Sequence, residues 1–146
     1  MSQSRTLTLV ADAERPHRGV IDTSVVIDME TIDPEALPEE LAVSALTLAE
    51  LAAGPHATDD PEERARRQDR LQRAEAAFDP LPFDAEAARA YGRIFSAVTA
   101  SGRKALDARA VDLLIAATAC AEDLPLFTRN GGDFRSLEGV LDVYAI

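Results

Sequence analysis

Two kinds of apolar pattern alternate along the chain. Short runs rich in β-branched residues are typical of strands, and longer segments rich in alanine and leucine are typical of helices. The expected strands lie at residues 19–22, 41–44, 124–128 and 140–146, and the expected helices at 23–29, 45–53, 61–78, 85–101 and 108–121. Strands that alternate with helices predict an α/β fold, a three-layer α/β/α arrangement with a central, mainly parallel sheet of four to five strands.

Local signals mark several helix ends. Asp84 and Asp107 each stand before an apolar helical segment, as N-terminal caps do. Gly54 and Pro55 follow the segment 45–53 and are expected to end that helix. These signals fix the helix boundaries more sharply than the apolar pattern does.

The first 18 residues stand apart from the alternating pattern. Residues 12–18 are polar and include Pro16, and residues 6–10 would pair as an extra strand or belong to a flexible tail. We expect the flexible tail, because chain ends are ordered only when something holds them. The predicted organisation is an N-terminal extension at 1–18 and one domain at 19–146.

Composition narrows the class of protein without naming its chemistry. A chain of 146 residues with 47% hydrophobic and 28% charged residues is expected to form one globular domain. No segment reads as a secretory signal or is apolar enough to cross a membrane, and one cysteine excludes an intramolecular disulfide, so a cytoplasmic location is expected. A net charge of −11 argues against nucleic-acid binding through bulk charge.

The candidate chemistry lies in four carboxylates at positions where the pattern favours apolar residues. Asp22 stands at the C-terminal end of the first expected strand and Asp133 follows the strand expected at 124–128, at the strand ends where ligands bind in open α/β sheets. Glu50 and Asp112 interrupt helices that are otherwise apolar on most faces. Burying a carboxylate is costly unless a cation or hydrogen bonds compensate for the lost water.

Two interpretations of these acids stay open at this point. In the first, each acid has its own structural explanation: Asp22 is a helix cap, Glu50 is a partly exposed side chain, and Asp112 is the partner of Arg109. In the second interpretation, these acids together bind a divalent metal ion at one site. Oxygen ligands without converging histidine or cysteine favour Mg²⁺ or Mn²⁺ over zinc.

Other phosphate-handling classes fit the spacing poorly. The glycine-rich loops GxxxxGK[ST] and GxGxxG are absent. A haloacid-dehalogenase-type phosphatase would have an aspartate where Ser24 stands, and response-regulator receivers usually have a lysine where this chain has Thr128 and Arg129. The class that remains is a hydrolase in which acids from separate segments bind a metal ion.

Four segments in order resemble the PIN-domain ribonucleases, and within them the VapC toxins of bacterial toxin–antitoxin pairs. The segments are VIDTSVVID at 20–28, VSALTLAEL at 43–51, ARAVDLLIAATA at 108–119 and LFTRNGGDF at 126–134. By position, the family's acids fall on Asp22, Glu50, Asp112 and Asp133, and its supporting polar residues on Ser24, Thr128 and Asn130. The extension at 1–18 departs from the family's pattern.

The resemblance implies a function as well as a fold. It implies a Mg²⁺- or Mn²⁺-dependent endoribonuclease with one or two ions, in which water activated by the ion attacks the phosphodiester in line. It also implies a homodimer and a small VapB-type antitoxin whose C-terminal segment covers the acidic pocket. The alternatives are a PIN fold that serves as a non-catalytic binding module, and a metal-dependent phosphatase on another α/β fold.

Arginines are the candidates for contact with RNA phosphates. Arg66, Arg70 and Arg73 share one face of the expected helix at 61–78, but acids lie among them, so a solvated surface is expected for most of them. Arg109 and Arg129 lie beside the candidate acids in sequence and are the better candidates for contact with phosphate or carboxylate.

Overall fold

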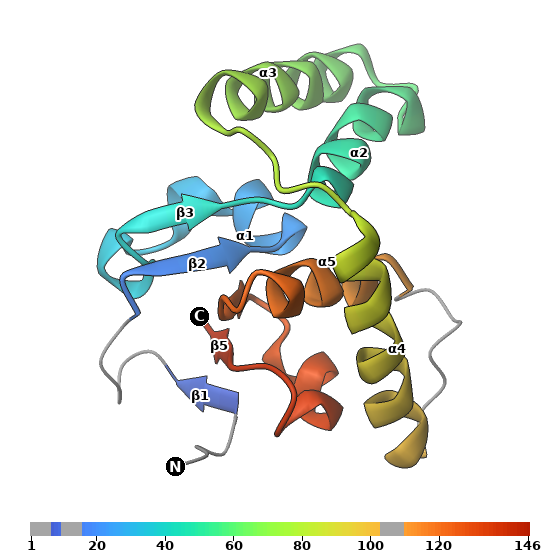
Figure 1. Ribbon diagram of the computed structural model, residues 1–146. Helices are drawn as coiled ribbons and strands as arrows, with labels where there is room; N and C mark the ends of the chain where they lie inside the picture. The colour runs from blue at the N-terminus through green and yellow to red at the C-terminus, as the bar shows by residue number, and fades with distance from the viewer. Residues whose placement is uncertain (1–6, 10–15, 103–109) are drawn as a thin grey trace.

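A five-stranded parallel sheet forms the centre of the protein (Figure 1). The computed structural model describes residues 7–9, 16–102 and 110–146. The strands are β1 (Leu7–Leu9), β2 (Arg18–Ile21), β3 (Glu40–Ala42), β4 (Leu126–Thr128) and β5 (Val143–Ala145). Their order across the sheet is β1-β5-β4-β2-β3, and every neighbouring pair is parallel. The predicted α/β class with a parallel sheet is therefore confirmed.

Helices connect the strands and cover both faces of the sheet. They are α1 (Thr23–Ile27), α2 (Ala45–Ala53), α3 (Pro61–Ala77), α4 (Ala85–Ala100) and α5 (Ala110–Ala121). Short 3-10 turns are η2 (Met29–Thr31), η3 (Pro34–Ala36), η4 (Gly54–Ala57) and η5 (Gly131–Leu137). In Figure 1, α3 and the far end of α2 lie together at one end of the molecule, and the beginning of α2 lies beside α5.

Side-chain caps begin the helices as the sequence suggests. The Asp84 carboxylate accepts a hydrogen bond from the backbone N–H of Ala87 at 3.0 Å, which confirms the predicted cap of α4. Asp60 and Ser44 cap α3 and α2 in the same way. Asp107, the other predicted cap, lies outside the described residues.

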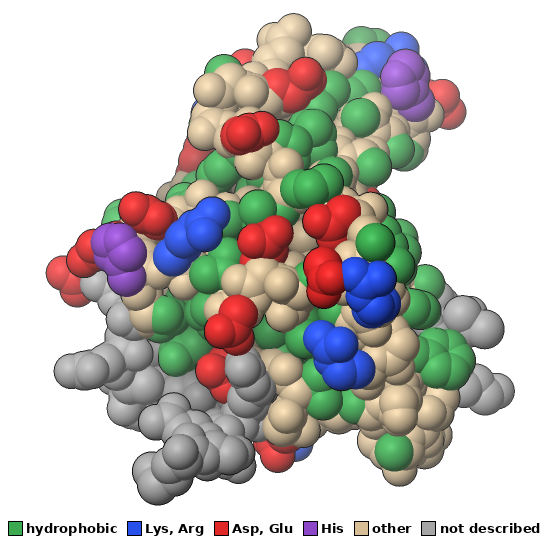
Figure 2. Space-filling view, viewed as in Figure 1, with side chains coloured by type: hydrophobic (Ala, Val, Ile, Leu, Met, Phe, Trp, Pro, Cys, Tyr) green, Lys and Arg blue, Asp and Glu red, His purple; other side chains and the backbone are tan. Residues whose placement is uncertain are grey.

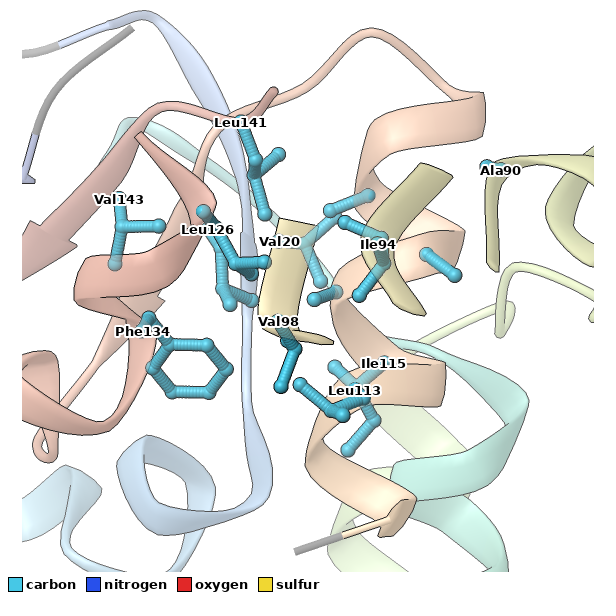
Figure 3. Close-up of a cluster of buried hydrophobic side chains, with 14 of the residues drawn as sticks. Val20, Ala90, Ile94, Val98, Leu113, Ile115, Leu126, Phe134, Leu141 and Val143 are labelled. Carbon is cyan, nitrogen blue, oxygen red and sulfur yellow. The ribbon is translucent and has the colours of Figure 1, made fainter. Parts of the chain in front are cut away.

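The strands bury both of their faces because successive side chains point in opposite directions. Val20, Leu126 and Val143 pack on one side against α4, α5 and η5 (Figure 3). Ile21 and Phe127 point to the other side, toward α1, α2 and α3. This two-sided burial explains the nearly continuous apolar runs in the strands.

The N-terminal extension contributes a strand, which corrects the expectation of a tail for part of it. Leu7–Leu9 pair in parallel with Val143–Ala145 at the edge of the sheet. The backbone groups along that side of β5 thereby gain hydrogen-bond partners. The other option, an extra strand within residues 6–10, is therefore correct for these three residues.

The strands differ from their expected bounds by one to three residues at their ends, and the helix ends show further differences. The helix after β2 ends at Ile27, and the chain continues in the 3-10 turn η2 rather than reaching residue 29 as one helix. The helix α2 ends at Ala53 as expected, but Gly54 keeps helical dihedrals and begins the 3-10 turn η4. The turn η5, which carries Asp133, was not anticipated.

Candidate active site

The candidate acids come from the ends of two neighbouring central strands and from two helices. Asp22 directly follows β2, and Asp133 lies in η5 after β4, the strand that pairs with β2. Glu50 lies in α2, and Asp112 lies in the first turn of α5. The carboxyl ends of parallel strands meet at one edge of the sheet, which is the usual place of a ligand site in this fold class.

Asp22 is buried and is fixed by hydrogen bonds. Its side chain is 3% exposed. Its Oδ1 accepts bonds from the Ser24 hydroxyl at 2.6 Å and from the backbone N–H of Val25 at 3.2 Å. Asp22 therefore does cap α1, as its structural explanation proposed. Among the described residues the hydrogen bonds to the Asp22 carboxylate both go to Oδ1, so the cap leaves Oδ2 for another role.

Ser24 connects the two strand ends, and Thr128 fixes the loop that follows β4. The Ser24 hydroxyl donates to Asp22 and accepts a bond from the backbone N–H of Arg129 at 3.1 Å. The Thr128 hydroxyl, which is buried, accepts a bond from the backbone N–H of Asn130 at 3.1 Å. These contacts hold the loop after β4 against the start of α1 and fit the supporting roles expected for Ser24 and Thr128.

Glu50 is held by a residue that the sequence interpretation missed. The Thr23 hydroxyl donates to Glu50 Oε1 at 2.5 Å. Thr23 Oγ1 also lies 3.1 Å from Thr47 Oγ1. Thr23 directly follows Asp22 in the sequence, so a hydroxyl residue beside a predicted acid was the signal that could have identified it.

The structure does not bring the predicted acids together as a complete ligand set. Asp112 and Asp133 are half-buried, and each makes further contacts. Over residues 16–102 and 110–146, no three carboxylate, histidine or cysteine side chains are placed so that they could share one metal ion. The hydroxyl bonds from α1 connect Asp22 and Glu50 to the same helical turn.

Arg129 and Arg109 were predicted to contact phosphate or a carboxylate, and the structure describes only the first of them. Arg129 pairs with a carboxylate, but the partner is Asp28 at 3.6 Å (Arg129 Nε to Asp28 Oδ2) and not one of the four predicted acids. Asp28 ends α1 and is half-exposed, so both partners of this ion pair remain accessible to solvent. Arg109 lies outside the described residues.

The surface over this region is acidic with basic side chains beside it. Figure 2 shows carboxylates gathered across the middle of one face, over the place where α1, α2 and α5 lie in Figure 1. The candidate ligand atoms are all carboxylate oxygens, the type of ligand that hard divalent cations prefer. The spacing of the acids fits only in part, because they are not arranged as a finished ligand set.

Comparison with known proteins decides the family. The PIN-domain family matches residues 19–140. The chain belongs to the PIN-domain family. It is 37% identical over 134 residues to Ribonuclease VapC5 of Mycobacterium tuberculosis, covering 90% of this chain and 96% of that protein. Ribonuclease VapC8 of the same species is 36% identical over 69% of this chain and 89% of its own length.

Solved structures agree with this assignment. The VapBC-5 toxin–antitoxin structure from Mycobacterium tuberculosis superposes with a TM-score of 0.79 at 35% identity, covering 90% of this chain and 100% of that chain. FitAcB from Neisseria gonorrhoeae gives a TM-score of 0.63 at 28% identity, covering 86% and 95%. The predicted resemblance to PIN-domain ribonucleases of the VapC group and the predicted fold are both confirmed.

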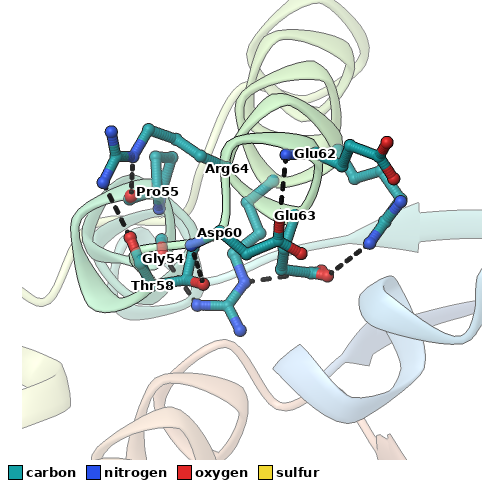
Figure 4. Close-up of polar contacts among 9 residues, drawn as sticks. Gly54, Pro55, Thr58, Asp60, Glu62, Glu63 and Arg64 are labelled. Carbon is teal, nitrogen blue, oxygen red and sulfur yellow. Dashed lines mark hydrogen bonds and ion pairs between the residues drawn. The ribbon is translucent and has the colours of Figure 1, made fainter.

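The arginines of α3 in this PIN domain are mostly committed to structural contacts. Arg64 donates to the carbonyl oxygens of Pro55 and Thr58 at 3.1 and 2.8 Å, and Arg67 donates to that of Gly54 at 2.9 Å (Figure 4). Arg66 and Arg73 form ion pairs with the neighbouring acids Glu63, Asp69 and Glu30. The hydrogen bond and the charge of Asp69 raise the pKa of Arg73. The expectation of a solvated, self-paired surface therefore describes most of this helix.

An apolar groove lies between α1 and α3 of this PIN domain. Its volume is about 450 Å³. Apolar side chains of α1, η2, β3 and α3 line it together with charged side chains of α3. Ile27, at the end of α1, is 47% exposed and is one of these lining residues. The helix α1 thus carries Asp22 at its beginning and an exposed apolar surface at its end.

Proposed function

We propose that this chain is an endoribonuclease that hydrolyses RNA phosphodiester bonds and acts as the toxin of a VapBC-type pair. The observation that carries the proposal is the buried Asp22 at the carboxyl end of a central strand, tied through the first turn of α1 to a network that includes Glu50. The relative Ribonuclease VapC5 is 37% identical to this chain over 134 residues, which favours the same activity here.

We infer that Asp22, Glu50 and Asp112 bind one or two Mg²⁺ or Mn²⁺ ions and that Asp133 assists them. Such an ion supplies Lewis-acid activation of water and stabilises charge on the phosphate oxygens. Ser24 keeps the Asp22 carboxylate in one orientation, and Thr128 and Asn130 hold the loop that carries Asp133. The support for this assignment is the oxygen-only donor set at one sheet edge.

RNA would be held near the acids by a small number of cations. Arg129 pairs with the half-exposed Asp28, so an RNA phosphate can compete for the Arg129 guanidinium without uncovering a buried charge. Arg109 stays a candidate for phosphate or carboxylate contact from its sequence position. The arginines of α3 contribute less, since most of them are already paired.

A VapB-type antitoxin is the proposed protein partner. A segment with apolar side chains would bury the groove beside α1, including Ile27. Because α1 leads from this groove to Asp22, the same segment would reach the acids and neutralise them with a basic side chain. The solved VapBC-5 complex shows that a relative assembles with an antitoxin, which supports this partner class.

Three further expectations belong to the proposal. The protein acts as a homodimer, residues 19–146 form the PIN domain and residues 1–18 are an extension of it, and the location is cytoplasmic. No helix in the described residues is long and apolar enough to span a membrane. The remaining alternative is a PIN fold that binds partners without catalysis.

The decisive experiment measures RNA cleavage by the wild-type chain and by Asp22→Asn and Asp112→Asn. With Mg²⁺ or Mn²⁺ present, we expect each substitution to reduce cleavage by at least about 10–100-fold, the range seen when even supporting residues of metal sites are lost. Asparagine keeps an acceptor for the cap at position 22, so α1 is preserved. Asp59→Asn is the matched control, because Asp59 is exposed and away from the site.

Two outcomes would contradict the proposal. Unchanged cleavage by both variants would remove these acids from the site. Equal inactivity of the folded wild-type chain and both variants, with antitoxin absent and divalent ions supplied, would favour the non-catalytic binding module.

A further inference from the structure

A short hydrogen-bonded chain links α1 to the candidate acid of α2. Thr23 Oγ1 lies 2.5 Å from Glu50 Oε1 and 3.1 Å from Thr47 Oγ1. The first distance lies in the range typical of a hydroxyl that donates to an ionised carboxylate. The Thr47 side chain is fully buried, while Thr23 and Glu50 are half-buried.

The chemistry of the three groups gives this chain a direction. A threonine hydroxyl carries one hydrogen, and an ionised carboxylate can only accept. Thr23 Oγ1 is the donor in both contacts, so its single hydrogen goes to the stronger acceptor, the Glu50 carboxylate at 2.5 Å, and Thr47 Oγ1 is the weaker acceptor at 3.1 Å. The buried Thr47 keeps the Thr23 hydroxyl against α2, the helix that carries Glu50.

The positions of these residues make the contact useful to the site. Thr23 and Ser24 are consecutive residues in the first turn of α1; the hydroxyl of Ser24 binds Asp22 and that of Thr23 binds Glu50. Thr47 and Glu50 are three residues apart in α2 and therefore share one face of that helix. A glutamate side chain has several rotatable bonds, and a fixed donor selects one carboxylate orientation from among them.

We propose that Thr23, in contact with the buried Thr47, is a positioning residue that holds the Glu50 carboxylate in its working orientation. This inference rests on the proposed role of Glu50 in the metal-dependent site. It adds to that role a residue pair outside the four acids and their predicted supporting residues. Because α1 contacts both Asp22 and Glu50, it sets the relative orientation of the two acids.

The test compares Thr23→Val, Thr23→Ser, Thr47→Val and Glu50→Gln in the full chain. Valine keeps the branched shape of threonine and removes the hydroxyl, whereas serine keeps the hydroxyl. Thr99→Val makes the same chemical change on α4, where the hydroxyl bonds only the backbone carbonyls of Phe95 and Ser96. The readouts are Mn²⁺ affinity by isothermal titration calorimetry, the melting temperature, and kcat and KM for a labelled single-stranded RNA.

We expect Thr23→Val to weaken Mn²⁺ binding by roughly 10-fold, as loss of a residue that orients a metal ligand does. We expect kcat to fall with little change in the KM for RNA, because the hydroxyl does not contact the substrate. Thr23→Ser should restore both values to near wild type. Thr47→Val should give a smaller loss in the same direction, and Thr99→Val none.

The outcomes separate this inference from the proposed function. If Glu50→Gln abolishes Mn²⁺ binding while Thr23→Val binds Mn²⁺ like wild type, the positioning role is wrong and the site assignment stands. If serine is as defective as valine at equal melting temperature, the hydroxyl is not responsible and the inference is overturned. If Glu50→Gln binds Mn²⁺ and cleaves RNA like wild type, the assignment of Glu50 itself fails, and the positioning role fails with it.

Discussion

At the scale of single residues, Gly19 of β2 leaves room for the Phe127 side chain of β4. Gly19 lies where a Cβ atom would stand 2.6 Å from Cε1 of Phe127 and 2.8 Å from its Cδ1. The Phe127 ring cannot move aside easily, because it is fully buried and stacks on Tyr144 with ring centroids 4.9 Å apart. A glycine at position 19 therefore allows β2 to approach the β4 side chain, and β2 is the strand that positions Asp22.

We predict that Gly19→Ala destabilises the protein by about 1–3 kcal/mol, the cost of overpacking a closely packed core. Gly92→Ala is the matched control. Nothing lies within 4 Å of a Cβ at Gly92, which stands inside α4. Alanine there should stabilise the protein by roughly 0.5–1 kcal/mol through helix propensity. Urea denaturation measures both effects, and a loss of stability in Gly92→Ala equal to that in Gly19→Ala would contradict the steric explanation.

At the scale of elements, two arginines fasten α3 to the end of α2. Arg64 and Arg67 donate to carbonyl oxygens of the η4 segment, where the helix end leaves carbonyls without intrahelical partners. We predict that Arg64→Met and Arg67→Met each lower the free energy of unfolding by about 1 kcal/mol, a typical net value for such bonds. RNA cleavage per folded molecule should be unchanged, because these guanidinium groups serve the fold.

Arg66 supplies the control for that prediction. Its side chain is 60% exposed and its contact is an ion pair with Glu63 at 3.3 Å. Exposed pairs of this kind contribute about 0–1 kcal/mol, so Arg66→Met should have a small effect on urea denaturation. Reduced cleavage by folded Arg64→Met or Arg67→Met would show instead that α3 binds RNA.

Local features were predictable from the sequence, and contacts between distant segments were not. Apolar runs such as residues 19–21 and 124–128 predicted buried parallel strands, and the cap residue Asp84 located the start of α4. The bond from Thr23 to Glu50 joins residues 27 positions apart, and neither residue carries a local signal for the other. The pairing of β1 with β5 likewise depends on an edge that exists only after the sheet has formed.

The same distinction applies to the candidate site. The acids Asp22 and Asp133 could be placed at one sheet edge, because the carboxyl ends of parallel strands share that edge. The pairing of Arg129 with Asp28 rather than with a candidate acid depends on how α1 ends beside the loop after β4. Periodicity places a residue on an element, but the partner of its side chain depends on how elements pack.

At the scale of the whole molecule, the net charge of −11 acts on the site and on the surface in different ways. Carboxylates on the acidic face repel each other and attract divalent cations, while the rest of the acidic surface repels RNA. Two bound divalent ions would change the net charge only from −11 to −7. RNA affinity should therefore be local, supplied by the ions and a few arginines.

We predict that divalent ions stabilise the folded protein by binding to the candidate acids around Asp22. At an Mg²⁺ or Mn²⁺ concentration about 100 times the Kd, the free energy of unfolding should rise by about 2.7 kcal/mol. For a domain of this size, that corresponds to an increase in Tm on the order of 5–10 °C. Differential scanning calorimetry with the ion and with excess EDTA measures the difference.

Charge screening alone would also stabilise an acidic protein, so the measurement needs two comparisons. NaCl at the same ionic strength reproduces screening without supplying a divalent ion for the candidate acids. The double variant Asp22→Asn, Asp112→Asn keeps nearly all of the surface charge and loses two of the proposed ligands. If the divalent effect persists in that variant or is matched by NaCl, the ions act on the surface as a whole. If it disappears in the variant and exceeds that of NaCl, the stabilisation comes from the candidate acids around Asp22.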